Sequence, residues 1–227
     1  MNIVIGVQTC NRLEYTKRTI EAVIRRNPES KDMPWVISDD GSTDGTREYI
    51  DGLSFINESN FYPKQTGITR GLERLVGLAV KHGDIILYLQ NDWEQIRWID
   101  FKSVEEFYEK YSNAGHIAMI TDKGRGNDQR LSAFGTRINL YTKEKFEPGK
   151  PIIIGKEKFI PGNWSYADIP GFTNLKFAIR MFDNNIFNEF TRLENIHKSG
   201  CDNYLLDNQP YFNIDYKSKE STVGKIK

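Results

Sequence analysis

The sequence is poor in cysteine and in long hydrophobic runs, and it has no excess of either charge. Its 227 residues include two cysteines, Cys10 and Cys201, whose wide separation argues against a disulfide framework or a metal knuckle. The formal net charge is zero, which argues against broad binding of nucleic acid through phosphate contacts. No apolar stretch approaches the roughly 18 residues that a bilayer requires. We therefore expect a soluble, cytoplasmic protein with no transmembrane segment and no nucleic-acid partner.

Length and composition are those of a globular domain. Hydrophobic residues make up 38% of the chain and charged residues 27%. The N-terminus enters a strand-like segment at residue 3, without the charged and apolar regions of a secretion signal. At this length one domain is the natural interpretation. We expect a single domain over 1–227, with different halves at 1–100 and 101–216 and a flexible tail at 217–227.

Two short polar clusters, each directly after an apolar run, are the most informative feature that is present. Asp39 and Asp40 follow the run at 35–38, and Asp92 follows the run at 85–89. Apolar runs of this kind predict buried parallel strands. Ligands of open α/β sheets bind where such strands end. The two clusters therefore predict a site for a polar, phosphorylated ligand and a divalent cation.

The first hundred residues alternate between strand and helix patterns. Strands are predicted over 3–7, 34–38 and 84–89, and helices from about Leu13 and over 43–49. A third helix is predicted from the spacing of its apolar residues, which are Ile68, Leu72, Leu75, Val76 and Ala79. Asn11 and Glu14 have the spacing of a helix cap and its capping-box partner. The alternation predicts an α/β fold with a parallel sheet.

The pattern is weaker beyond residue 100. It predicts a helix over 104–114, a strand over 116–121 and short antiparallel strands over 137–160. A further helix is predicted over 182–198.

Four blocks of the sequence, taken in order, resemble family 2 glycosyltransferases. They are Val7-Gln8-Thr9-Cys10-Asn11-Arg12, Asp39-Asp40-Gly41-Ser42-Thr43-Asp44-Gly45-Thr46, Gly67-Ile68-Thr69-Arg70-Gly71 and Gln90-Asn91-Asp92. The resemblance covers roughly residues 3–95. It implies the GT-A fold, an α/β/α sandwich with a mostly parallel central sheet. It also implies a nucleotide-sugar-binding half at 1–100 and a variable, acceptor-binding half at 101–216.

The resemblance implies transfer of a sugar from a nucleoside-diphosphate sugar, UDP-sugar first, to a hydroxyl of a glycan or other acceptor, with inversion. Mn²⁺ or Mg²⁺ on the diphosphate would neutralise the leaving group, and such cations prefer oxygen ligands. The implied metal ligand is Asp92. The implied nucleotide-sugar-binding residues are Thr9, Asn11, Arg12, Asp39, Asp40, Arg70, Asn91 and Asp92.

One block departs from the family pattern, in which the metal motif is commonly Asp-x-Asp. Here the three positions are Gln90, Asn91 and Asp92, so that two of them are uncharged amides. Glu94 would compensate only if the loop turned back. The departure favours an alternative function, a catalytically silent nucleotide-sugar or glycan-binding module. A nucleotidyltransferase ranks last, because the residues after the first strand, 8–12, contain no glycine.

The catalytic base of an inverting transferase takes a proton from the acceptor hydroxyl. The candidates are Asp168, Glu194 and Glu189, with Asp168 ranked first because aromatic and turn residues surround it in sequence. Each predicted site residue also has a structural alternative. Asp and Ser favour turns and helix caps, which is where Asp39, Asp40 and Asp44 would then lie.

Overall fold

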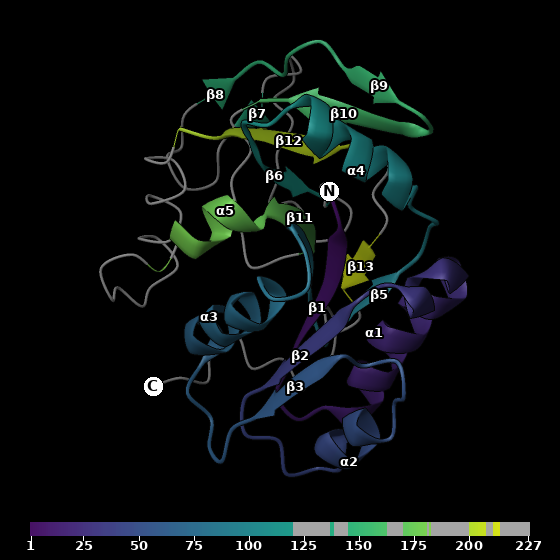
Figure 1. Ribbon diagram of the computed structural model, residues 1–227, viewed down its shortest axis with the longest axis vertical. Coiled ribbons are helices and arrows are strands. Elements are labelled where there is room, and N and C mark those ends of the chain that lie inside the picture. The colour runs from purple at the N-terminus through teal and green to yellow at the C-terminus, as the bar shows by residue number, and fades with distance from the viewer. Residues whose placement is uncertain are drawn as a thin grey trace.

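The structure is a computed structural model that describes residues 1–119, 137–138, 145–162, 170–180, 182, 200–207 and 211–213. Among these residues the chain forms one large sheet with helices on both faces (Figure 1). Nearly all of the helix predicted at 182–198, and the tail predicted at 217–227, lie outside the described residues. No helix in the described ranges is long and apolar enough to cross a membrane.

The central sheet has nine strands in the order β3-β2-β1-β4-β11-β6-β12-β10-β9. Their bounds are β1 Ile3–Thr9, β2 Trp35–Asp39, β3 Glu58–Phe61, β4 Ile85–Gln90, β6 Ala114–Ala118, β9 Ile152–Ile154, β10 Glu157–Pro161, β11 Gly171–Asn174 and β12 Asp202–Leu206. All of these strands except β10 and β11 run in the same direction. Two small sheets pair β5 (Trp93–Gln95) with β13 (Tyr211–Asn213) and β7 (Arg137–Ile138) with β8 (Lys145–Phe146).

Helices cover the sheet from both sides. They are α1 (Leu13–Arg26), the 3₁₀ helix η1 (Pro28–Asp32), α2 (Thr46–Asp51), α3 (Ile68–Ala79), α4 (Phe101–Lys110) and α5 (Leu175–Ala178). In Figure 1, α3 and α5 lie to one side of the strands and α1, α2 and α4 to the other. The strands and helices predicted for the first hundred residues are confirmed, with shifts of a few residues at their ends.

Alternate residues of β1 face opposite helical layers, as the period of a strand requires. Ile3, Ile5 and Val7 belong to the core that includes residues of α1, α2 and α4. Val4 belongs to the core that includes residues of α3 and α5. Because both faces are covered, all seven residues of β1 are buried. These two cores establish the predicted α/β/α sandwich.

Strand β3 lies at an edge of the central sheet, and no sequence pattern predicts it. Its residues Glu58–Phe61 are mostly polar and are half-buried. Within the described part of the chain it pairs only with β2, in parallel, so that it forms an edge of that sheet. An edge strand buries less of its surface than a central one, which explains why it lacks an apolar run.

Candidate functional site

Three parallel strands end side by side where the predicted site residues begin. The register places Thr9 of β1 opposite Asp39 of β2, and Gln8 opposite Gln90 of β4. The pairing continues past the strand ends, where the Asp40 amide donates to the Thr9 carbonyl over 2.9 Å. The ends of β2, β1 and β4 therefore meet at one edge of the sheet, as the two polar clusters predicted.

Asp39 is completely buried, and its carboxylate is held by residues of this chain. Its Oδ2 accepts from the Thr9 hydroxyl over 2.8 Å and from the Ser42 hydroxyl. Its Oδ1 accepts from the Ser42 amide and from Arg47 Nε, each over 3.0 Å. The Thr9 hydroxyl is thereby committed to Asp39. Arg47 lies on α2, and it supplies the positive charge that a buried carboxylate needs.

The neighbouring carboxylate, Asp40, points to the other side of the sheet. It accepts hydrogen bonds from the amides of Thr66 and Gly67, over 2.8 and 2.7 Å, and from the Thr66 hydroxyl over 2.6 Å. Arg74 of α3 donates to it over 3.1 Å. Successive side chains of an extended segment alternate in direction, so Asp39 binds toward α2 and Asp40 toward α3.

The loop between β1 and α1 has an unusual backbone. Asn11 and Arg12 are both left-handed, with φ of 55° and 62°. Few non-glycine residues adopt this conformation, and two in succession make a sharp corner. The predicted Asn11 cap with Glu14 is wrong, because Arg12 occupies the cap position and its own side chain does not cap the helix. The Asn11 carboxamide oxygen instead accepts from the Thr43 amide over 2.9 Å.

Asp44 takes over the capping role from a distance. Its carboxylate accepts from the Leu13 amide at the start of α1 over 2.9 Å, and from the Thr46 hydroxyl at the start of α2 over 2.6 Å. Burial alone would raise the pKa of this carboxyl, but the hydrogen bonds from Thr46 and Leu13 outweigh it and lower the pKa. One carboxylate thus joins the first turns of two helices.

The end of β4 holds the predicted metal ligand. The Asn91 carboxamide is buried and donates to the Asn11 carbonyl over 2.8 Å, which ties β4 to the left-handed corner. The Asp92 side chain is 16% exposed, and its Oδ2 lies 3.6 Å from Arg12 Nη1. This pair brings the charged groups that follow β1 and β4 together at the shared edge.

Glu94 does not reinforce Asp92. Its two carboxylate oxygens bind Arg18 over 2.7 Å and Arg25 over 3.1 Å, both on α1. The loop therefore does not turn back in the way that would compensate for the missing charge at Gln90 and Asn91.

The protein groups at this edge suit a divalent cation that is coordinated mainly by the phosphate oxygens of a bound nucleotide. The described residues contain no group of three or more His, Cys, Asp or Glu side chains that would hold a metal ion. The edge offers the Asp92 carboxylate, next to the guanidinium of Arg12. One carboxylate is a partial shell for Mg²⁺ or Mn²⁺, which such sites complete with water and phosphate oxygens. Asp92 therefore suits a metal that arrives with a diphosphate.

The predicted site residues that remain are Arg70 and the three candidate bases. Arg70 lies on the first turn of α3, with its side chain 43% exposed, and its Nη1 is 2.9 Å from a carboxylate oxygen of Glu73. The three candidate bases, Asp168, Glu189 and Glu194, lie outside the described residues.

Cys10 lies at the same edge but is unsuited to act as a nucleophile. Its thiol donates to the Asp40 carbonyl over 3.2 Å, and burial raises its pKa to about 11. A thiol with this pKa is protonated at neutral pH. The sequence analysis missed Arg47 and Arg74, the cations that hold Asp39 and Asp40. Arg47 lies in the first turn of α2 and Arg74 in the second turn of α3, and neither position carried a signal beyond that of an ordinary solvated arginine.

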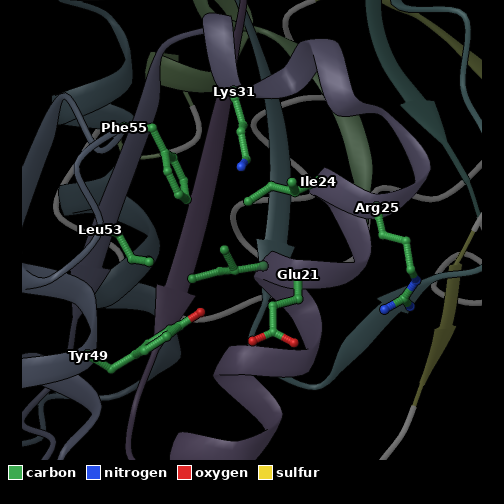
Figure 2. Close-up of a pocket in the computed structure, with 8 residues that line it drawn as sticks. Glu21, Ile24, Arg25, Lys31, Tyr49, Leu53 and Phe55 are labelled. Atoms are coloured by element: carbon green, nitrogen blue, oxygen red, sulfur yellow. The ribbon is translucent and has the colours of Figure 1, made fainter.

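A separate pocket of about 430 Å³ lies between α1, η1 and α2 (Figure 2). Ile20, Ile24, Leu53 and Phe55 form its apolar wall. Its polar lining consists of Glu21, Arg25, Lys31 and Tyr49, and Figure 2 shows Lys31 and Tyr49 pointing toward the apolar side chains while Arg25 points away from them. Of the predicted site residues that the structure describes, none lines this pocket, so it is distinct from the strand-end site.

Comparison with known proteins gives one family and a set of similar structures. A model of the family described as Glycosyl transferase family 2 matches residues 4–154. No curated protein sequence matches the chain significantly. The crystal structure of S. aureus TarS 1-349 in complex with UDP-GlcNAc is similar with a TM-score of 0.62 and 15% identity, over 93% of this chain and 57% of that one.

A second similar structure is that of GalNAc-T7 with UDP, GalNAc and Mn²⁺. Its TM-score is 0.67 at 14% identity, over 95% of this chain and 45% of that one. At such low identity both likenesses show the fold alone, and that fold is GT-A. The chain spans less than two thirds of the length of either structure.

Proposed function

The chain belongs to glycosyl transferase family 2, and on that premise we propose that it transfers a sugar from a nucleoside-diphosphate sugar to a hydroxyl of a glycan or other acceptor. The observation that carries the proposal is the shared strand edge. There strand pairing, hydrogen bonds and an ion pair connect Asn11 and Arg12 after β1, Asp39 and Asp40 at β2 and Asp92 after β4.

UDP-sugar is the donor that we test first. The similar TarS and GalNAc-T7 structures contain UDP-GlcNAc or UDP, which supports this choice. The nucleoside would lie over the ends of β1 and β2, where Thr9, Asn11, Asp39 and Asp40 meet. The diphosphate would lie toward Arg12 and Asp92, and Arg70 would approach from the first turn of α3. A guanidinium suits this place because it binds phosphate oxygens with two parallel N–H groups.

Asp92 is the residue that would hold Mn²⁺ or Mg²⁺. When bound, such an ion neutralises charge on the diphosphate leaving group. The Mn²⁺ in the GalNAc-T7 structure supports this assignment. Asn91 would contribute through its carboxamide. This group donates to the Asn11 carbonyl and holds the end of β4, and with it the backbone of the next residue, Asp92, in place.

The reaction would be a single displacement with inversion. The acceptor oxygen bonds to the anomeric carbon, the bond from that carbon to the diphosphate breaks, and a carboxylate takes the hydroxyl proton. We assign this base to Asp168 first and to Glu194 or Glu189 next, all in the half of the chain that would bind the acceptor.

The deciding experiment measures donor binding and donor hydrolysis in the same samples. Calorimetry with UDP and GDP, with and without Mn²⁺, reports binding, and release of nucleoside diphosphate from several nucleotide sugars reports chemistry. We expect UDP to bind more tightly with Mn²⁺ and at least one UDP-sugar to be hydrolysed. If neither nucleotide binds under any condition, the proposal is wrong.

Asp92→Asn tests the metal role. It should lower the affinity for Mn²⁺ in the presence of UDP by about tenfold or more, because only amide oxygens remain for a dication that prefers carboxylates. Glu94→Gln is the matched control, since that acid binds arginines of α1 and should leave the titration unchanged. Equal titrations of Asp92→Asn and the wild type would remove the metal from the proposal.

A silent nucleotide-sugar-binding module is the second candidate. The single carboxylate at Gln90-Asn91-Asp92 favours it, because a weakly held metal gives less help to the leaving group. Its signature is tight UDP binding with no release of UDP from any sugar donor, with or without Mn²⁺.

A further inference from the structure

The first turn of α3 lacks a cap of its own. Gly67 is in the cap position with a φ of 97°, it makes no side-chain cap, and no acidic residue lies in the first turn. The first amides of a helix have no partner within the helix, and the positive end of its dipole favours an anion. An acceptor from outside the helix can therefore stabilise this end.

Asp40 supplies that acceptor from the end of β2. Its Oδ2 accepts from the Gly67 amide over 2.7 Å and from the Thr66 amide over 2.8 Å, and its Oδ1 accepts from the Thr66 hydroxyl over 2.6 Å. The Asp40 side chain is 3% exposed. The carboxylate thus holds the N-cap residue of a helix that begins 28 residues later in the sequence, and it fixes the segment that leads into that helix.

Arg74, one turn further along α3, completes the arrangement. Its Nη1 donates to Asp40 Oδ1 over 3.1 Å, and its guanidinium lies over the Tyr62 ring at 3.3 Å from the ring centre. The Arg74 side chain is 17% exposed. Tyr62 in turn donates its amide to the Asp39 carbonyl over 3.0 Å. Asp40 therefore connects the end of β2 to α3, and the guanidinium of Arg74 compensates the buried negative charge of its carboxylate.

A second tie fixes the same turn from β1. The Gln8 carboxamide donates to the Ile68 carbonyl over 2.8 Å and accepts from the Tyr88 hydroxyl over 2.8 Å. Gly71 packs so closely on Gln8 that a Cβ there would lie 2.2 Å from Gln8 Nε2. The turn that carries Arg70 is thus held from two neighbouring strands.

We infer that Asp40 and Arg74 are positioning residues, which set the affinity for the donor by fixing the first turn of α3 and with it Arg70. This inference rests on the proposed function, since the ligand that it concerns is a nucleoside diphosphate. The competing account gives Asp40 a direct hydrogen bond to the nucleoside. The two accounts differ because the observed donors already engage both oxygens of Asp40.

A double-mutant cycle between Asp40→Asn and Arg70→Met separates the two accounts. UDP affinity is measured by calorimetry in the presence of Mn²⁺. If Asp40 acts through Arg70, each single variant should bind about tenfold more weakly, and the double variant no more weakly than the worse single variant. Losses that multiply to about a hundredfold would show independent contacts and overturn the inference.

Arg74 gives a second series that does not alter the carboxylate. Arg74→Met should weaken UDP binding by about fivefold, and Arg74→Lys by less, because lysine restores the charge but not the planar stack on Tyr62. Lys81→Met is the matched control, since Lys81 follows α3 at its other end and binds Glu58. A folded Arg74→Met protein with unchanged UDP affinity would overturn the inference, whatever its loss of stability.

Hydrogen exchange supplies a readout that needs no ligand. The amides of Thr66 and Gly67 should exchange about tenfold faster in Arg74→Met than in Lys81→Met, because Arg74 no longer holds Asp40, which is their acceptor. Unchanged exchange would also overturn the inference. Failure of the proposed function is seen separately, as a wild-type protein that binds no nucleoside diphosphate.

Discussion

The ends of β2 and β4 lie at one edge of the sheet and both carry acidic residues, but their carboxylates differ in what they bind. Asp39 and Asp40 are buried and accept hydrogen bonds from amides, hydroxyls and arginines of their own chain. Asp92 is partly exposed and lies 3.6 Å from the guanidinium of Arg12. The two strand ends thus differ in the burial of their carboxylates and in the donors observed around them, a difference that membership of a motif does not reveal.

The largest expected difference between the two strand ends is in folding stability. Asp39→Ala removes the acceptor of Thr9, Ser42 and Arg47 and should lower the free energy of unfolding by about 3–5 kcal/mol, because the buried donors of Thr9 and Ser42 and the partly buried guanidinium of Arg47 all lose their partner. Asp92→Ala, at the more exposed strand end, should cost less than about 1 kcal/mol. Urea unfolding measures both. Similar losses in the two variants would contradict the comparison.

A second, smaller effect concerns the cation beside Asp92. Arg12→Met should tighten Mn²⁺ binding to the nucleotide-free protein by about five- to tenfold, because a competing positive charge is removed from the carboxylate. Arg18→Met is the matched control, as it removes a cation that binds Glu94 instead. Paramagnetic broadening by Mn²⁺ measures both variants. If they titrate alike, Arg12 has no special relation to the metal site.

The smallest effect is expected at Asp44, the third acid of the β2 block. Asp44→Ala should lower the free energy of unfolding by about 1 kcal/mol, the usual cost of a lost helix cap. Because folding lowers the pKa of Asp44, its contribution is fully present above the unfolded value of about 4. The contribution is lost as the pH falls through the lowered pKa.

Urea unfolding of the wild type and Asp44→Ala at pH 7 and pH 3 measures this prediction. The difference between the two proteins should shrink at the lower pH. A difference that grows in acid would show that Asp44 does not act as an ionised cap.

The sequence predicts the sheet better than it predicts the site. Strands β1, β2 and β4 are buried on both faces and therefore consist mostly of apolar residues. A continuous apolar run is a local pattern, so the positions of these strands are evident from the sequence. The same holds for α3, whose apolar face is periodic. Strand β3 is missed because an edge strand needs no such run.

Side-chain partners are a different matter, because they lie far apart in the sequence. The capping role predicted for Asn11 falls to Asp44, 33 residues further on, since the left-handed corner turns the Asn11 side chain toward Thr43. Arg74 is likewise 34 residues from Asp40. A local pattern locates the carboxylates at the sheet edge, but only the packing of α2 and α3 decides which donors reach them.

The position of β11 has a consequence for the order of folding. This strand, Gly171–Asn174, runs antiparallel between β4 and β6 and is the only strand that joins them in the described sheet. The four strands from β3 to β4 are complete once residue 90 has been made. At about 5–20 residues per second, a ribosome needs on the order of ten seconds more to deliver β11.

During that interval β4 would have no partner strand on the side where β11 pairs in the finished fold. Its residues Ile85–Leu89 are completely or almost completely buried in the finished fold. Unpaired apolar strands are sites of aggregation in nascent chains. Nascent chains halted between about residues 120 and 170 should therefore be bound by chaperones and cleaved by proteases more readily than chains extended past β11.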